Sequence, residues 1–164
     1  DVMKKKPIKE SGIFTKSRIW RVAYQGIMIG LITLAAFIIG LATPENILPH
    51  VEGLSSEEVR VEIGQTMAFI TLAFAELVHV FNVRNPKKSL FKTHPFRNKM
   101  LLLAIAVSAM LMIVILAVPT LRNVFSIPVL PAQDILEVIL LVLSPILIVE
   151  IMKLFKLNGS KKEE

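Results

Sequence analysis

A single carboxylate interrupts a long apolar stretch of this sequence. Glu76 lies well inside the segment from Ile63 to Phe81, and a charge at the centre of a membrane span costs about 2.5 to 3.5 kcal/mol. Carboxylate oxygens suit hard cations such as calcium, and a carboxyl group in a low dielectric can also exchange a proton. The residue type therefore predicts an ion or proton site. The alternative is a neutral, hydrogen-bonded Glu76 that only ties helices together.

Two further polar residues accompany Glu76 in this segment. On a helix with 100° per residue, Gln65 falls about 20° from Glu76 around the axis. His79 follows three residues later. We expect this face to lie in a bundle interior, with Gln65 and His79 as polar residues along the ion path. For His79, hydrogen bonding at the membrane interface is the simpler alternative.

Small residues mark a contact surface in the first apolar segment. Gly26 and Gly30 form a G-x-x-x-G pattern, which lets another helix approach the backbone closely. We expect both glycines to serve helix packing, although the pattern also arises by chance in apolar segments.

Other site chemistry is missing from the sequence. With no cysteine, disulfides, thiolate metal sites and cysteine nucleophiles are excluded. Neither a glycine-rich phosphate loop nor an H-E-x-x-H motif occurs. We therefore expect no catalytic residue and no bound cofactor in this chain by itself.

The elements that must carry these residues are membrane helices. Of the 164 residues, 54% are hydrophobic, and they gather in segments of about 20 residues, the length that crosses a bilayer as a helix. We predict an all-α polytopic membrane protein: a lead-in over 1–21, a four-helix transmembrane domain over 22–155 and a tail over 156–164. The expected spans, which we predict to pack as a bundle, are 22–42, 63–81, 100–118 and 135–155.

Basic residues indicate the orientation. Lysines and arginines are concentrated before the first span and between the second and third, whereas the segments 43–62 and 119–134 hold one arginine each. The positive-inside rule then predicts that both termini are cytoplasmic. The net charge of +6 is thus a topology signal, and we expect no nucleic-acid partner.

Two features of the last span need local partners. Pro145 removes a backbone hydrogen bond and kinks the helix unless neighbouring groups satisfy the freed carbonyl. Glu150 lies toward one end and Glu137 toward the other, where we expect them at the surface, in contact with headgroups or with a base such as Lys153.

The order of these features resembles the C-terminal end of P-type cation pumps, calcium pumps of bacteria above all. The matching stretches run through the chain in this order: Asp1, Val2, Met3 and Pro7; Gly26 and Gly30; Gly64 to Phe69; Glu76; Phe81 to Arg84; Ser89 to Phe91; Leu147 to Phe155.

The resemblance implies the last four of ten membrane helices of an ATP-driven pump in a bacterial cell membrane. It implies calcium as the transported ion, with ATP and magnesium used by the parent protein. Glu76 falls where calcium pumps with two ions per cycle place a carboxylate ligand and many relatives place glutamine. Gly26 and Gly30 would face a helix that this chain does not contain.

The implied partners are the lipid bilayer and the remaining helices and cytoplasmic domains of the pump. The phosphorylation motif and the nucleotide-binding parts are missing, so the fragment is expected to be inactive alone. Because the chain opens on Asp1, we expect a fragment. The alternative is a self-contained four-helix channel, carrier or accessory subunit, in which Glu76 and Gln65 line a path; a purely structural anchor is a third.

Overall fold

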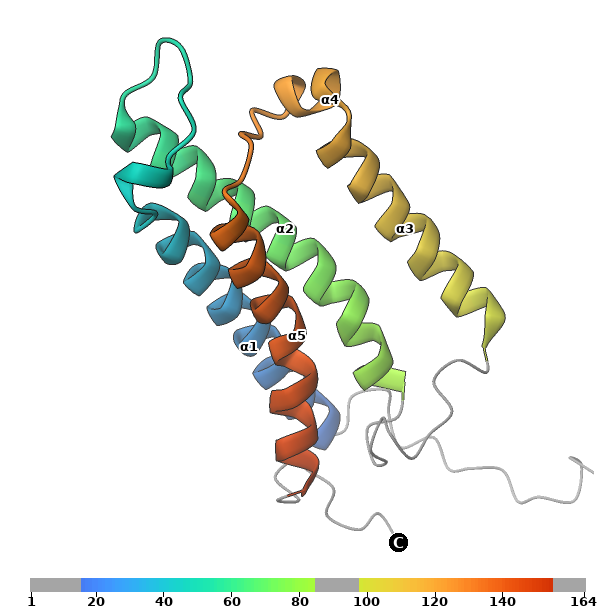
Figure 1. The fold of residues 1–164 in the computed structure, drawn as a ribbon. Coiled ribbons are helices and arrows are strands. Elements are labelled where there is room, and N and C mark those ends of the chain that lie inside the picture. Colours follow the sequence, from blue (N-terminus) through green and yellow to red (C-terminus); the bar gives the residue numbers. More distant parts are fainter. Residues whose placement is uncertain (1–15, 85–97, 155–164) are drawn as a thin grey trace, which may run out of the picture.

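The computed structural model describes residues 16–84 and 98–154, and every regular element within them is helical (Figure 1). The elements are α1 (Lys16–Leu41), the short 3-10 helix η2 (Glu45–Ile47), α2 (Ser56–Arg84), α3 (Lys99–Ala117), α4 (Pro119–Val124) and α5 (Ala132–Leu154). Helices α1, α2, α3 and α5 are long and apolar enough to cross a membrane. The predicted all-α fold with four membrane helices is confirmed.

The start of α1 and the end of α5 lie at the same end of the molecule (Figure 1), as an even number of spans requires. Which side of the membrane that end faces stays a prediction from the charged residues. Helix α1 already begins at Lys16, inside the expected lead-in, and the expected tail over 156–164 lies outside the described residues.

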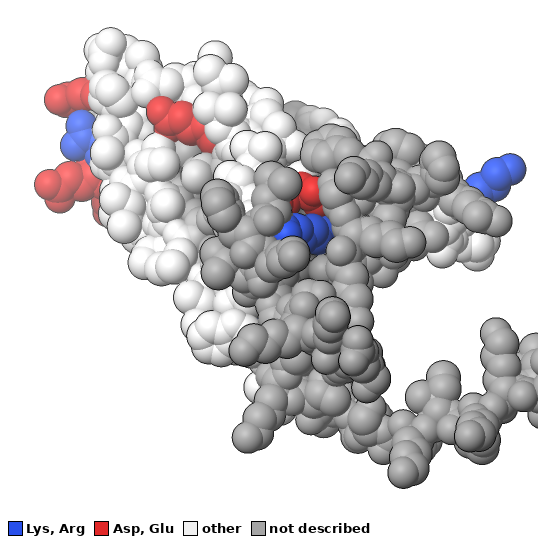
Figure 2. All heavy atoms as spheres, turned by 90° about the horizontal axis from the view of Figure 1, so that it is seen from below, with Lys and Arg blue, Asp and Glu red and all other residues white. Residues whose placement is uncertain are grey.

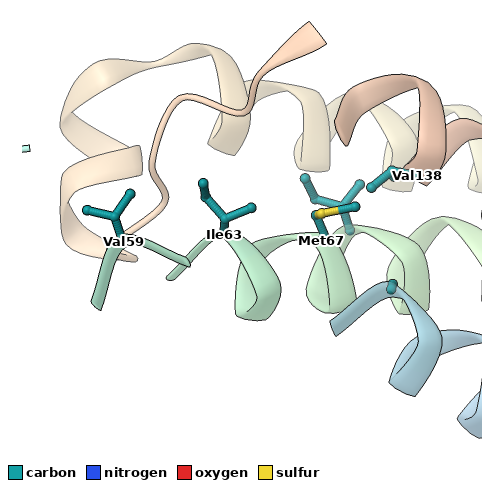
Figure 3. Packing of buried hydrophobic residues seen from close by; sticks show 6 residues of the cluster. Val59, Ile63, Met67 and Val138 are labelled. Atoms are coloured by element: carbon teal, nitrogen blue, oxygen red, sulfur yellow. The ribbon is translucent and has the colours of Figure 1, made fainter. Parts of the chain in front are cut away.

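Helices α1, α2 and α5 form one packed bundle. Its main cluster takes Ala36 from α1, Ile63 and Met67 from α2 and Val138 from α5, all buried (Figure 3). A second cluster toward the other end joins Met28, Ile29 and Ile32 of α1 to Val149 of α5. Helix α5 therefore packs along both partners and holds the pair together.

Helix α3 stands apart from these three helices (Figure 1). Met112 is its one buried residue, so the expected four-helix bundle is wrong for this chain, which forms a three-helix bundle with a separate fourth helix. The reason is the composition of α3: after Lys99, Ser108 is its only polar side chain. Lipid tails solvate such a surface as well as another helix does, so little free energy favours packing.

Two glycines lie where α1 and α2 approach each other closely. A Cβ atom added to Gly40 of α1 would lie 2.5 Å from the Cα of Gly64 in α2, and one added to Gly64 would lie 2.8 Å from the carbonyl oxygen of Phe37. Both distances are too short for any side chain. The crossing of α1 and α2 therefore requires glycine at both positions, which the G-x-x-x-G pattern in α1 did not reveal.

Local hydrogen bonds determine where α2 begins. The backbone N–H of Ser55 donates to Glu58 Oε2 at 2.8 Å, and the Glu58 N–H donates to Ser55 Oγ at 3.4 Å. This reciprocal capping box satisfies two backbone N–H donors at the start of the helix. Helix α2 thus starts seven residues before the apolar segment that begins at Ile63.

The proline inside α5 is accommodated without ending the helix. Pro145 has no N–H for the carbonyl of Leu141 four residues earlier. The hydroxyl of Ser144 donates to that carbonyl instead, at 2.7 Å. The helix continues from Ala132 to Leu154 because the freed acceptor is satisfied locally.

Gly40→Ala is expected to lower the free energy of unfolding by about 1 to 3 kcal/mol, because the added methyl group overpacks the α1–α2 crossing. Gly26→Ala is the matched control, since a Cβ there has no neighbour within 4 Å. The measurement is reversible unfolding of the chain in detergent, followed by helical circular dichroism. Equal stability of the two variants would contradict the close crossing.

Candidate functional site

The predicted path residues Gln65 and Glu76 both lie on one exposed face of α2. Phe69 and Leu72 lie between them on the same face, each with 42% of its surface exposed. The expectation of a bundle interior is therefore wrong for the bundle that this chain forms, because α1 and α5 pack on the opposite side, around Ile63, Met67 and Ile70. The structure leaves the Gln65–Glu76 face without a covering helix among the described residues.

His79 lies apart from that face. It is 6% exposed, and its Nδ1 atom is buried without a hydrogen-bond partner in the described structure. Glu76 and Lys153 are both close enough to act on it electrostatically. His79 is thus buried in the bundle and is not part of an exposed polar face with Gln65.

An ion pair lies near the C-terminal end of α5. Lys153 Nζ lies 2.9 Å from Glu150 Oε1, so the predicted pairing is confirmed. The side chains are only 7% and 12% exposed, and the expected surface position of Glu150 is wrong. Charges withdrawn from solvent need such a partner, because each alone would carry a large desolvation cost.

Gly26 and Gly30, the predicted packing residues, lie on an exposed face of α1. An added Cβ at either position would have no atom within 4 Å. They make no close helix contact in this structure, in contrast to Gly40. As with Gln65 and Glu76, no described helix covers the surface on which they lie.

These residues do not form a complete metal site among themselves. Across residues 16–84 and 98–154, no three His, Asp or Glu side chains gather where they could hold an ion. Calcium takes six to eight oxygen ligands. The Gln65–Glu76 face therefore offers part of a coordination shell at most.

A polar junction at the opposite end of the bundle was missed by the sequence analysis. Thr43 Oγ1 donates to Asp134 Oδ2 at 3.0 Å, and Arg60 Nε donates to the Thr43 carbonyl at 3.1 Å. Thr43 is 2% exposed and Asp134 1%. The junction ties the ends of α1, α2 and α5 together. An aspartate placed directly before the last apolar segment was the available signal.

Comparison with known protein families matches residues 1–155 to the model described as "Cation transporting ATPase, C-terminus". The chain belongs to this family. The resemblance seen in the sequence is confirmed across nearly the whole chain, and the four apolar helices agree with a multi-pass protein of the cell membrane.

Two curated relatives belong to the same group. Calcium-transporting ATPase 1 of Bacillus cereus (strain ATCC 10987 / NRS 248) is 35% identical over 161 residues, covering 96% of this chain and 18% of the relative. Calcium-transporting ATPase of Bacillus subtilis (strain 168) is 37% identical over 127 residues, covering 76% and 13%. This cation-transporting ATPase C-terminus spans less than a fifth of either relative. No solved structure matches the chain.

Thr43→Val is expected to lower the free energy of unfolding by about 1 to 3 kcal/mol, because it leaves the buried Asp134 carboxylate without its donor. Thr33→Val is the matched control. The Thr33 hydroxyl is buried without a partner in the described structure, so its removal should be neutral or stabilising. Detergent unfolding measures both, and similar effects would argue against the Thr43–Asp134 bond.

Proposed function

We propose that this chain is the C-terminal membrane domain of an ATP-driven cation transporter whose transported ion is calcium. In this proposal Glu76 supplies one carboxylate to the ion pathway, Gln65 extends the same polar face, and the chain supports the packing of core helices outside it. The family match and the names of the two relatives support the coarse assignment.

The uncovered face of α2 is the observation that carries the site proposal. A charged Glu76 facing lipid would cost about 2.5 to 3.5 kcal/mol, and polar groups in spans normally face protein or water. Gln65 on the same exposed face adds a second polar group. A helix from elsewhere in a longer protein would remove the cost and bring the oxygen ligands that the face lacks.

The exposed glycines of α1 support the same conclusion. Gly26 and Gly30 have free space around their backbone, and small residues in a membrane helix permit a close helix contact. We assign that contact to a core helix of the parent pump. ATP and magnesium would act on cytoplasmic domains outside this chain, whose own residues include no phosphate loop.

Glu76→Gln in the full-length protein is expected to raise the calcium concentration for half-maximal uptake by about tenfold or more, the value of one charge-assisted contact. Glutamine keeps the size of the side chain and removes the charge. The measurement is ATP-dependent uptake of radioactive calcium into inverted membrane vesicles.

Glu137→Gln is the matched control for this substitution. Glu137 is a half-buried carboxylate of α5 that accepts a hydrogen bond from Gln133 Nε2 at 3.1 Å. It should leave the calcium dependence unchanged. Unchanged uptake in Glu76→Gln as well would make Glu76 structural and overturn its role as a ligand.

Covering of the α2 face can be measured directly, because the chain has no cysteine. A spin label on Gln65→Cys should collide freely with oxygen in the isolated chain in a bilayer. In the full-length protein the same label should collide much less often, since a core helix covers it. Equal collision rates in both proteins would contradict the proposed contact and favour a self-contained membrane protein.

A further inference from the structure

Two adjoining cavities that differ in polarity lie between α3, α4 and the three-helix bundle. The first, of about 440 Å³, is apolar and takes its walls from α2, α5 and the end of α3, with Ile70, Val138 and Ile139 among them. The second, of about 400 Å³, is more polar and is lined by residues that include His50, Glu62 and Asn123. Arg122 and the segment Ile127 to Val129 form walls of both.

The apolar cavity lies among membrane-spanning helices. Its walls include residues of α2, α3 and α5, which all qualify as spans, and α3 stands to one side of the other two (Figure 1). At the other end of the helices, most of the described surface visible in Figure 2 carries neither acidic nor basic side chains. A cavity in such a place suits hydrocarbon better than water, because its walls offer few hydrogen-bonding groups.

Arg122 is held at the boundary between the two cavities. Its Nε atom donates to the Ile127 carbonyl at 3.4 Å, and the Ile127 N–H donates to the Arg122 carbonyl at 2.9 Å. Ser126, with a φ of 52°, forms the turn between them. The two terminal NH₂ groups of the guanidinium make no hydrogen bond to any described residue. They are fixed donors available to an anion such as a phosphate.

Glu62 lines the polar cavity with the opposite charge. It is half-buried and makes no hydrogen bond or ion pair within the described ranges. A headgroup that carries a phosphate and an ammonium group would find a partner for each charge in this one cavity. Basic pockets between membrane helices are known to bind the phosphates of lipid headgroups.

We propose that one membrane glycerophospholipid with an ammonium headgroup is bound here, with an acyl chain in the apolar cavity, its phosphate on Arg122 and its ammonium group near Glu62. The lipid fills the space between α3 and the bundle, and so couples α3 to helices that it scarcely contacts directly. This site is independent of the proposed cation path, because neither cavity is lined by Gln65 or Glu76.

Native mass spectrometry of the full-length protein, purified in mild detergent, tests the site. Phosphatidylethanolamine and phosphatidylglycerol are added in equal amounts. We expect one retained phosphatidylethanolamine per chain, in preference to phosphatidylglycerol. Arg122→Gln should lower its retention about tenfold, as expected for loss of a charge-assisted contact. Lys99→Gln, which removes an exposed cation at the start of α3, should leave retention unchanged.

Two further variants separate lipid binding from folding. Ile139→Trp fills the apolar cavity from a half-exposed position and should displace the lipid, whereas Leu140→Trp, on an exposed neighbour outside the cavity, should not. Glu62→Gln should abolish the preference for phosphatidylethanolamine. No retained lipid in the natural protein, or equal retention in Ile139→Trp and Leu140→Trp, would overturn the proposal. Equal retention of both lipids by the natural protein would overturn the headgroup assignment.

Discussion

Helices in a bilayer gain little from hiding apolar surface, since the surrounding lipid is as apolar as their side chains. They associate where backbones can approach closely enough for many van der Waals contacts. In this chain that place is the crossing of Gly40 and Gly64, where there is no room for a Cβ atom on either helix. The crossing pairs α1 with α2, and α5 then packs against both through Val138 and Val149. The Thr43–Asp134 bond and the Arg60–Thr43 bond hold the same three helices together next to the crossing.

This arrangement decides which surfaces remain uncovered. Once α2 turns Ile63 and Met67 toward its partners, Gln65 and Glu76 must face the other way, because they lie on the opposite side of the same helix. The surface of α1 with Gly26 and Gly30 is left open in the same way. Polar groups in membrane spans normally face protein or water, and small residues normally mark a helix contact. Faces such as those of Glu76 and Gly26 are therefore unusual on the lipid-facing surface of a complete membrane protein. In our proposal, both faces are contact surfaces for helices of a longer chain. The chain covers less than a fifth of either relative.

Helix α3, unlike α1 and α2, has no face that its sequence marks out for packing. Its side chains are apolar all round apart from Lys99 and Ser108, so nothing in its sequence selects one face for packing. Helix α4 and the turn at Ser126 connect α3 to α5, and this connection leaves the apolar cavity open beside α5. Arg122 is fixed at the edge of that space by Ile127. The composition of α3 thus accounts for its separation, and the α3–α5 connection accounts for the position of this arginine.

The sequence by itself determined the helical class, the four spans and the family, because length and hydropathy suffice for the first two and an ordered set of short motifs for the third. It also identified the need for a partner at Pro145, which Ser144 meets within the same helix turn. The sequence did not predict contacts between residues that are far apart in the chain. Gly40 and Gly64 are 24 positions apart and Thr43 and Asp134 are 91 apart, and helical periodicity describes only one helix at a time. Only the tertiary structure decided that Glu76 faces outward, that His79 is buried in the bundle and that Glu150 is buried with Lys153, because each depends on which side of a helix its neighbours occupy.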